Sequence, residues 1–272
     1  MKKFEGVLIC TDLDGTLLDS KKRISRENSE AIEYFKSEGG YFTFVTGRMP
    51  FYAIDSYEAV RPNAPIGCIN GGGLYDYEKE KYIWTEELPR GVTELIKAVD
   101  ESCDGASIQV SLFDKVYFSK DNVVMEHFRA ATKLPNVCVP YTEVTEPIAK
   151  IIFGCDTEED IALVERTLRA HPLADSFEFI RSEKRLFEIL PKGIGKGTAL
   201  VKLAEHLGID MKKTVAIGDY DNDISMLRAA GAGIAVANAS ENAKAAADFI
   251  TVSNNESAIA KVVYELERFI EI

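Results

Sequence analysis

The sequence predicts an α/β fold, in which a Rossmann-like core built on a parallel sheet carries an inserted α+β domain. Short apolar runs alternate with helical patterns over the first 69 residues, and the same alternation returns from residue 197 to the end. The region between them follows a different pattern. The 272 residues are roughly 1.8 times a typical domain of about 150 residues, which fits one large domain or two modest ones.

The N-terminal elements alternate as in a parallel sheet whose two faces are both covered by helices. Continuous apolar runs, typical of strands buried on both faces, lie at residues 7–10, 41–45 and 66–69. Ser25 can cap the first helix, whose apolar side carries Ala31, Ile32 and Phe35, and glycines 39 and 40 end it. A second helical stretch separates the second and third runs.

The C-terminal elements repeat this alternation. A helix is expected at 197–207, because leucine and alanine recur there at helical spacing before Gly208. Strands are expected at 214–217, 233–237 and 249–252, and further helices at 224–230 and 259–270.

The middle of the chain is typical of an α+β module. Residues 107–112 and 115–118 predict a hairpin around Phe113 and Asp114. Helices are expected near 121–132 and 157–169, a strand at 150–154, and a strand pair at 177–180 and 186–189. We therefore divide the chain into a core of residues 1–82 and 191–272 and an insert of residues 83–190.

Composition excludes several classes of protein. There are 32 Lys and Arg against 44 Asp and Glu, a net charge of −12, which argues against binding nucleic acid or an anionic membrane by bulk charge. No apolar run approaches the roughly 20 residues of a membrane span, and the N-terminal apolar stretch of residues 7–10 is shorter than the apolar core of a secretion signal. The five cysteines are scattered without a C-x-x-C pair, so we expect reduced thiols and a cytoplasmic location.

The first polar motif, Asp12-Leu13-Asp14-Gly15-Thr16, directly follows the first predicted strand. Open α/β sheets bind their ligands just beyond the carboxyl ends of strands. Gly15 permits a tight turn, and the neighbouring N–H groups can face an anion. The alternative is an ordinary turn and helix cap, for which Asp, Gly and Thr are all favoured.

Two further motifs could hold an anion. Thr46-Gly47-Arg48 follows the second strand, so its hydroxyl and N–H groups face the same edge of the sheet. Lys196, within Gly193-Ile194-Gly195-Lys196-Gly197-Thr198, places an ammonium group at the start of a helix. The spacing is not that of a Walker A loop. Taken singly, the first of these motifs is more typical of a helix start, and the second is more typical of a solvated lysine.

The fourth motif, Gly218-Asp219-Tyr220-Asp221-Asn222-Asp223, again follows an apolar strand. It begins like a calcium-binding loop, but Ile224 and Ala230 stand where an EF-hand needs Gly and Glu. Carboxylates gathered at one strand end repel one another unless a cation neutralises them. Together with Asp12 and Asp14 they form an oxygen-rich site suited to Mg²⁺.

In this order, the four motifs resemble those of the haloacid dehalogenase (HAD) superfamily of phosphotransferases. The insert of about 100 residues, too long for a loop, is similar to the large C2-type cap domain of the Cof-type sugar-phosphatase branch. Asn70-Gly71-Gly72 and the Asp219-x-x-Asn222-Asp223 spacing also resemble that branch. The resemblance implies a Mg²⁺-dependent phosphatase that hydrolyses phosphate monoesters of small metabolites through an aspartyl-phosphate intermediate.

The resemblance also implies a role for each site residue. Asp12 is the nucleophile, and Asp14 protonates the leaving alcohol and then takes a proton from the attacking water. The phosphoryl oxygens are held by Thr46, Gly47, Lys196 and Asn222. Mg²⁺ is bound by Asp12, Asp219 and Asp223, and by Asp14 through its main-chain carbonyl. Arg48 is a further candidate on the substrate side.

Two alternatives remain open from the sequence. A phosphomutase on the same scaffold would return the phosphoryl group to a sugar instead of water. A catalytically silent binding module would take up a small phosphorylated metabolite without reacting, although binding alone does not require a nucleophile. We expect the insert to select the substrate, because all four motifs lie outside it.

Overall fold

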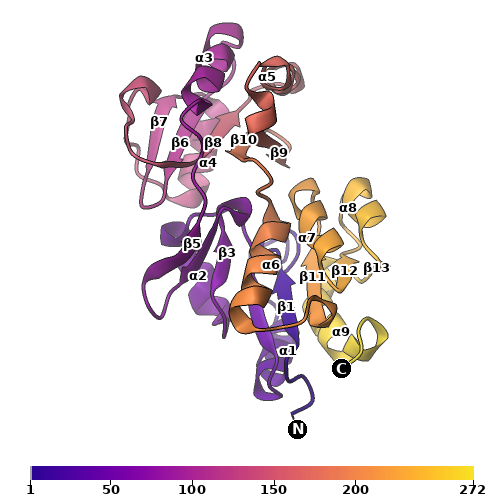
Figure 1. Ribbon diagram of the computed structural model, residues 1–272. Helices are drawn as coiled ribbons and strands as arrows, with labels where there is room; N and C mark the ends of the chain where they lie inside the picture. Colours follow the sequence, from indigo (N-terminus) through magenta and orange to yellow (C-terminus); the bar gives the residue numbers. More distant parts are fainter. Residues whose placement is uncertain (1) are drawn as a thin grey trace. The chain divides into compact units, whose positions relative to one another are not determined.

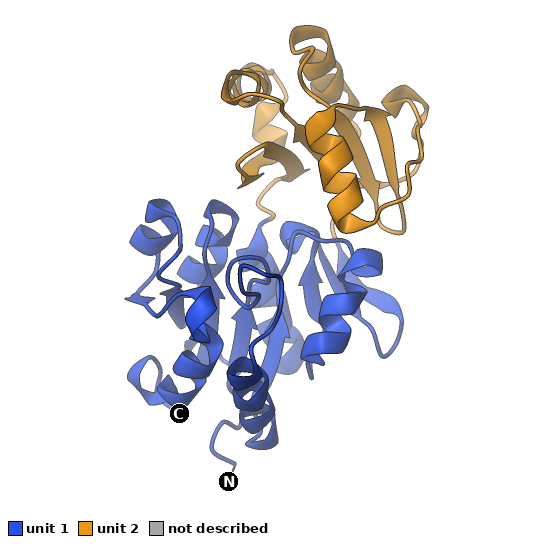
Figure 2. Cartoon of the chain, turned by 180° about the vertical axis from the view of Figure 1, so that it is seen from behind, with its two compact units in different colours: residues 1–85, 195–272 blue, residues 86–194 orange. Residues whose placement is uncertain are grey.

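The computed structural model describes residues 2–272, which form two compact units (Figure 2). Unit 1 contains the chain up to Thr85 together with Gly195–Ile272, and unit 2 is the segment Glu86–Ile194. Each unit has its own sheet and its own core, so each is described by itself.

A five-stranded parallel sheet forms the centre of unit 1 (Figure 1). Its strands, in spatial order, are β13 (Phe249–Ile250), β12 (Ala232–Ala235), β11 (Thr214–Gly218), β1 (Leu8–Thr11) and β2 (Tyr41–Phe44). Every neighbouring pair is parallel, and the four longer strands are almost fully buried. The α/β core predicted from the alternating pattern is therefore confirmed.

The order of the strands changes direction between β1 and β11. From β1 the chain steps outward through α1 (Arg26–Ser37) to β2, whereas from β11 it steps the other way through α7 (Ile224–Ala229) to β12. Since such crossovers are right-handed, opposite steps place α1 and α7 on opposite faces of the sheet. The carboxyl ends of β1 and β11 thus flank the switch point, where sheets of this kind bind ligands.

Three further helices of unit 1 pack on these two. α9 (Ala258–Tyr264) lies against α1, while α6 (Lys196–Leu207) and α8 (Glu241–Ala246) lie against α7. Ser25 caps α1 as predicted, accepting a hydrogen bond from the Asn28 N–H at 3.1 Å. α8 is not anticipated by the sequence analysis, because its six residues bury only Ala243 and so carry no apolar stripe.

The third apolar run does not simply extend the parallel sheet. β3 (Ile66–Cys68) meets the β2 side only at one bridge, Val45 with Gly67, and otherwise pairs antiparallel with β4 (Gly73–Asp76), which in turn pairs with β5 (Lys81–Thr85). α2 (Pro50–Val60) precedes β3. The β4–β5 hairpin was not predicted, because β5 is half-exposed throughout and shows no apolar alternation.

Unit 2 is built on a five-stranded antiparallel sheet in the order β7-β6-β8-β10-β9. The strands are β6 (Ile108–Leu112), β7 (Val116–Lys120), β8 (Ile148–Gly154), β9 (Phe177–Glu183) and β10 (Leu186–Pro191). The predicted hairpins β6–β7 and β9–β10 are present, as are helices α4 (Val123–Thr132) and α5 (Glu158–Ala170). One helix, α3 (Val92–Ser102), was missed and packs against α5.

The two faces of this sheet differ in chemistry. One face contributes Val110, Ile151, Phe153 and Ile189 to an apolar core shared with α3 and α5. The other face buries polar side chains, because the strand register places Gln109, Ser111, Lys150 and Glu188 on the same side. No helix within residues 2–272 has the length and apolar character needed to cross a bilayer.

Candidate active site

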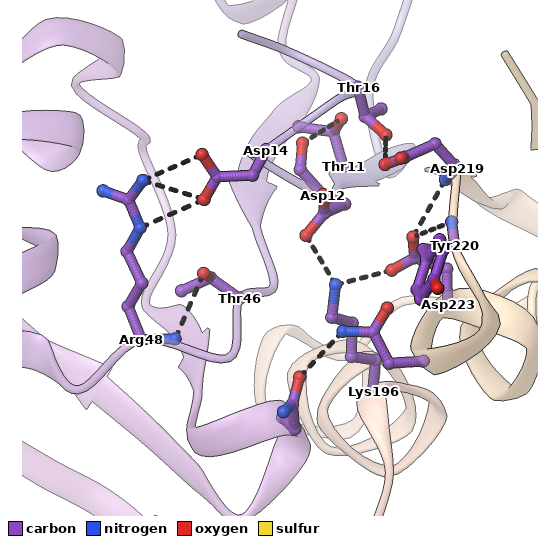
Figure 3. Close-up of polar contacts among 12 residues, drawn as sticks. Thr11, Asp12, Asp14, Thr16, Thr46, Arg48, Lys196, Asp219, Tyr220 and Asp223 are labelled. Atoms are coloured by element: carbon purple, nitrogen blue, oxygen red, sulfur yellow. Dashed lines mark hydrogen bonds and ion pairs between the residues drawn. The ribbon is translucent and has the colours of Figure 1, made fainter. Parts of the chain in front are cut away.

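Two sequence motifs meet at the switch point of the unit 1 sheet. Asp12 follows β1 and Asp219 follows β11, and the strands run side by side in register up to these residues, with Thr11 beside Ile217. The Asp12 N–H donates to the Ile217 carbonyl at 2.9 Å, which fixes the exit of the first motif against the neighbouring strand. Figure 3 shows Asp12, Asp219, Asp223 and Lys196 gathered around this point.

Lys196 forms the centre of the cluster. Its ammonium nitrogen lies 2.5 Å from Asp12 Oδ1 and 2.6 Å from Asp223 Oδ1. The lysine is 1% exposed, Asp12 6% and Asp223 0%, so all three charges are held away from water. Because α6 begins at Lys196, the lysine is fixed at the first turn of a helix that packs against α7.

The fourth motif is folded so that Asp219 and Asp223 face the cluster, whereas the Asp221 carboxylate accepts hydrogen bonds from Ser240 and Asn242. Asp223 Oδ2 accepts hydrogen bonds from the N–H groups of Asp219, at 2.9 Å, and Tyr220, at 3.0 Å. Asp219 in turn accepts a hydrogen bond from the Thr16 hydroxyl at 2.7 Å (Figure 3). Hence the first motif orients Asp219 across 203 residues of sequence.

Gly15 makes this approach possible. It has φ +92°, in the left-handed region that favours glycine, and a Cβ placed there would lie 2.5 Å from Asp219 Oδ2. Any other residue would therefore displace the Asp219 carboxylate.

The donor set fits a hard divalent cation. One carboxylate oxygen from each of Asp12, Asp219 and Asp223 lies within 4.8 Å of the others. These three carboxylates against the one ammonium of Lys196 leave a surplus of two negative charges in a buried site. Mg²⁺ prefers a few carboxylate oxygens together with waters, and its charge equals that surplus.

The pKa values reflect the same surplus. Burial raises the pKa of Asp12 well above its usual value, and the nearby carboxylates add to this against the attraction of Lys196. Burial and the charge of Asp223 raise the pKa of Asp219 to about 6. Burial alone would lower the pKa of Lys196, but Asp12 and Asp223 outweigh it and raise that pKa, so the ammonium stays charged.

The Asp14 carboxylate points away from the cluster. It accepts hydrogen bonds from Arg48 and from Lys22, and Figure 3 shows it turned toward the guanidinium group. Burial raises the pKa of Asp14, but the two cations outweigh burial and hold that pKa below its usual value. Of the four proposed metal-binding residues, the side chains of three are thus brought together and that of Asp14 is not.

The phosphate-binding candidates lie around the cluster. Thr46 is buried, and its hydroxyl oxygen accepts the Arg48 N–H at 3.2 Å. Asn222 donates from Nδ2 to Asn70 Oδ1 at 3.1 Å, and a Cβ on Gly47 would lie 3.0 Å from the Asn70 amide. Asn70 therefore connects the second and fourth motifs.

Asn70 and Lys22 are the residues that the sequence analysis did not place in the site. Asn70 is fully buried and has φ +51°, a strained conformation for a residue other than glycine. Its position directly after an apolar strand was visible in the sequence, whereas its bond to Asn222, 152 residues away, was not. Lys22 carried no sequence signal, because it lies in a polar turn.

Comparison with known proteins places this geometry in a family. Residues 9–263 match the family model of the haloacid dehalogenase-like hydrolases. The chain is 27% identical over 261 residues to 5-amino-6-(5-phospho-D-ribitylamino)uracil phosphatase YitU of Bacillus subtilis (strain 168), covering 95% of this chain and 96% of that protein. It is 29% identical over 266 residues to pyridoxal phosphate phosphatase YbhA of Escherichia coli (strain K12), covering 94% and 97%.

A solved structure agrees with these relatives. A haloacid dehalogenase-like hydrolase from Bacteroides thetaiotaomicron matches 96% of this chain and 100% of its own, with a TM-score of 0.83 and 29% identity. The matched segment 9–263 includes all four motifs. The chain therefore belongs to the haloacid dehalogenase-like hydrolase family, and the predicted enzyme class, a phosphoric monoester hydrolase, is confirmed.

Proposed function

We propose that this protein is a Mg²⁺-dependent phosphatase that hydrolyses phosphate monoesters of small metabolites through a phosphorylated Asp12. The observation that carries the proposal is the placement of Asp12. Its carboxylate is buried at the carboxyl end of β1, 2.5 Å from the Lys196 ammonium and within 4.8 Å of carboxylate oxygens of Asp219 and Asp223. A buried nucleophile beside a fixed cation suits attack on an anionic phosphoryl group.

Mg²⁺ would be held by the side chains of Asp12, Asp219 and Asp223 and by the main-chain carbonyl of Asp14. When bound, it supplies positive charge that reduces the repulsion between the Asp12 carboxylate and the substrate phosphoryl group. The surplus of two negative charges in the cluster supports this assignment.

The chain's own residues divide the reaction into two steps. In the first, an Asp12 oxygen forms a bond to phosphorus as the ester oxygen leaves, and Asp14 gives that oxygen a proton. Asp14 must be protonated for this step, although Arg48 and Lys22 favour its charged form, which is the form that acts as the base in the second step. In the second, water attacks the phosphorus of the aspartyl-phosphate, Asp14 takes a proton from the water, and inorganic phosphate and the free Asp12 carboxylate are released. Lys196 remains charged throughout and balances the phosphoryl oxygens.

Binding of the phosphoryl group is assigned to the groups around the cluster. Thr46 offers a hydroxyl, Gly47 a main-chain N–H, and Asn222 an amide held by Asn70. Because these groups are assigned to the phosphoryl group and all four motifs lie outside residues 83–190, we assign selection of the remainder of the substrate to that segment, the proposed cap domain. The named relatives act on pyridoxal phosphate and on a phosphorylated ribitylaminouracil, which supports a small phosphorylated metabolite as substrate.

A phosphate-release screen tests the proposal. Pyridoxal phosphate, sugar phosphates and p-nitrophenyl phosphate are incubated with the protein in Mg²⁺ or in EDTA. We expect phosphate release from at least one ester in Mg²⁺, its loss in EDTA, and no release by Asp12→Asn. Asp175→Asn, the same substitution at an exposed position of unit 2, is the matched control and should behave as wild type.

The screen also separates the alternative functions. A phosphomutase would convert one sugar phosphate into its isomer with little free phosphate. A silent binding module would be stabilised by a phosphorylated metabolite without turning it over. Turnover that persists in EDTA would contradict the metal assignment.

A further inference from the structure

We propose that Arg48 and Lys22 form a two-cation clamp that orients the Asp14 carboxylate, so that both residues affect the reaction through Asp14 and do not contact the phosphoryl group. This inference rests on the proposed role of Asp14 in proton transfer. Arg48, which was expected from the sequence to lie on the substrate side, is thereby assigned the role of positioning Asp14.

The first half of the clamp is a two-pronged contact from Arg48. Its Nη2 lies 2.8 Å from Asp14 Oδ2 and 3.0 Å from Oδ1, and its Nε lies 3.2 Å from Oδ2. The remaining terminal nitrogen, Nη1, donates to the Ser56 hydroxyl of α2 at 3.3 Å. All three nitrogens of the guanidinium group are thus directed at protein acceptors, in the fork geometry that fixes a carboxylate in a plane.

The second half of the clamp is Lys22, whose ammonium lies 2.7 Å from Asp14 Oδ1. Lys22 has φ +59°, which a lysine rarely adopts, so the turn that carries it must be held by other contacts. Asp19 provides them. Its carboxylate accepts the N–H groups of Lys21 and Arg23 and both prongs of the Arg23 guanidinium, at 2.8 to 3.2 Å.

The consequence is that both oxygens of Asp14 are held by cations, and Figure 3 shows the Arg48 guanidinium on the side of Asp14 away from Asp12 and Lys196. A short side chain held at both oxygens has little rotational freedom. The position from which Asp14 exchanges a proton is therefore set by Arg48 and Lys22. An arginine that served as a phosphate ligand would instead act independently of Asp14.

A double-mutant cycle separates these two roles. Arg48→Met and Lys22→Met are each made in the wild type and in Asp14→Asn, and kcat and KM are measured with an alkyl phosphate and with p-nitrophenyl phosphate. In the wild type we expect Arg48→Met to lower kcat for the alkyl ester about tenfold, a part of the roughly 10²–10⁴ that a general acid–base contributes. Lys22→Met should cost less, because its side chain is 66% exposed.

The two roles are distinguished by whether the loss of kcat depends on the presence of the Asp14 carboxylate. In Asp14→Asn, neither substitution should lower kcat further, and in the wild type the loss should be small for p-nitrophenyl phosphate, whose leaving group needs little protonation. Arg48→Lys keeps the charge but not the fork, so its kcat should lie between those of wild type and Arg48→Met. Lys21→Met, on the same turn but not a partner of Asp14 within residues 2–272, is the matched control and should leave kcat unchanged.

Other outcomes would overturn the clamp. An equal loss from Arg48→Met in both backgrounds, or a loss confined to KM, would make Arg48 a substrate ligand. If the wild type releases phosphate from no ester, the proposed function fails, and the clamp is tested by melting temperature instead. Arg48→Met must then lower the melting temperature in the wild type and not in Asp14→Asn, and equal shifts would refute the contact.

Discussion

Each unit of the chain buries a lysine against carboxylates, but the two lysines are held in different ways. In unit 1, Lys196 lies between Asp12 and Asp223 with Asp219 close by, at the carboxyl ends of parallel strands. In unit 2, Lys150 is 1% exposed and its ammonium lies 2.8 Å from Glu188 Oε2, on neighbouring strands of the antiparallel sheet.

The difference lies in the balance of charge. Lys150 and Glu188 carry opposite charges, so this pair has no net charge. Three carboxylates lie close to Lys196, and burial together with their mutual repulsion raises the pKa values of Asp12 and Asp219. A buried ion pair without net charge is typical of a structural contact. A buried cluster with net negative charge at strand ends indicates a binding site for a cation and an anionic substrate.

Removal of the nucleophile should give the largest effect. Asp12→Asn replaces the attacking oxygen by an amide and should reduce phosphate release by roughly 10⁴-fold or more. The measurement is phosphate release together with intact-protein mass after a rapid acid quench. A phosphate adduct on Asp12→Asn would show that another residue is the nucleophile.

Removal of the proton donor should have a smaller effect. Asp14→Asn leaves the nucleophile and the main-chain carbonyl in place, so we expect a loss of about 10²–10⁴ in kcat for an alkyl phosphate and less for an aryl phosphate. Loss of the base should also slow hydrolysis of the intermediate. An 80 Da adduct, the mass of one added phosphoryl group (about 80 Da for HPO₃), should then accumulate on Asp14→Asn, and an equal loss for both esters would contradict the assigned role.

The balanced pair of unit 2 should matter for stability and not for the chemistry. Lys150→Met leaves Glu188 charged and buried, and should lower the free energy of unfolding by about 3–5 kcal/mol. The double variant Lys150→Met/Glu188→Leu should recover most of this, and both should retain kcat with p-nitrophenyl phosphate. Urea unfolding and phosphate release measure the two quantities.

The exposed pair Lys97 and Glu101 of α3 is the matched control for this prediction. Their side chains are 64% and 68% exposed and lie 3.7 Å apart. Lys97→Met should change the free energy of unfolding by less than about 1 kcal/mol. If Lys150→Met lowers the free energy of unfolding by no more than that, the buried pair does not stabilise the fold.

Much of the fold was predictable because its signals are local. Buried parallel strands are continuous apolar runs, and caps such as Ser25 precede their helices directly. In the β4–β5 hairpin, strand β5 is exposed or half-buried throughout and lacks that signal. α3 was missed although Val92, Leu95, Ile96 and Val99 follow helical spacing, because Gly91 caps it without a side-chain hydrogen bond and no start signal marks it.

The candidate site, too, was predictable only in part. That Asp12, Asp219 and Asp223 meet was expected, because motifs at the ends of parallel strands share one edge. Lys196 begins α6 and was expected there from the family resemblance. The direction of each side chain was not. The turn of Asp14 toward Arg48 and Lys22, and the bond from Asn222 to Asn70, depend on contacts between residues that no local pattern relates.

The smallest expected effect tests the surplus of charge itself. At pH 7, Mg²⁺ at 100 times its dissociation constant should stabilise the wild type by about 2.7 kcal/mol, measured as a rise in melting temperature. The folded pKa of Asp219, about 6, lies above its usual value, so its ionisation destabilises the metal-free protein as pH rises through 6. Asp219→Asn should therefore melt higher than wild type in EDTA at pH 7, and Mg²⁺ should shift it little.

Protons compete with Mg²⁺ for the same carboxylate, so the Mg²⁺-induced shift in the wild type should shrink as pH falls from 7 to 5. The variant Lys150→Met/Glu188→Leu should keep the full shift at pH 7, because its charges were balanced before the change. An equal Mg²⁺ shift in wild type and Asp219→Asn would place the cation elsewhere. The distinction between a balanced and a surplus buried cluster would then not predict where this chain binds metal.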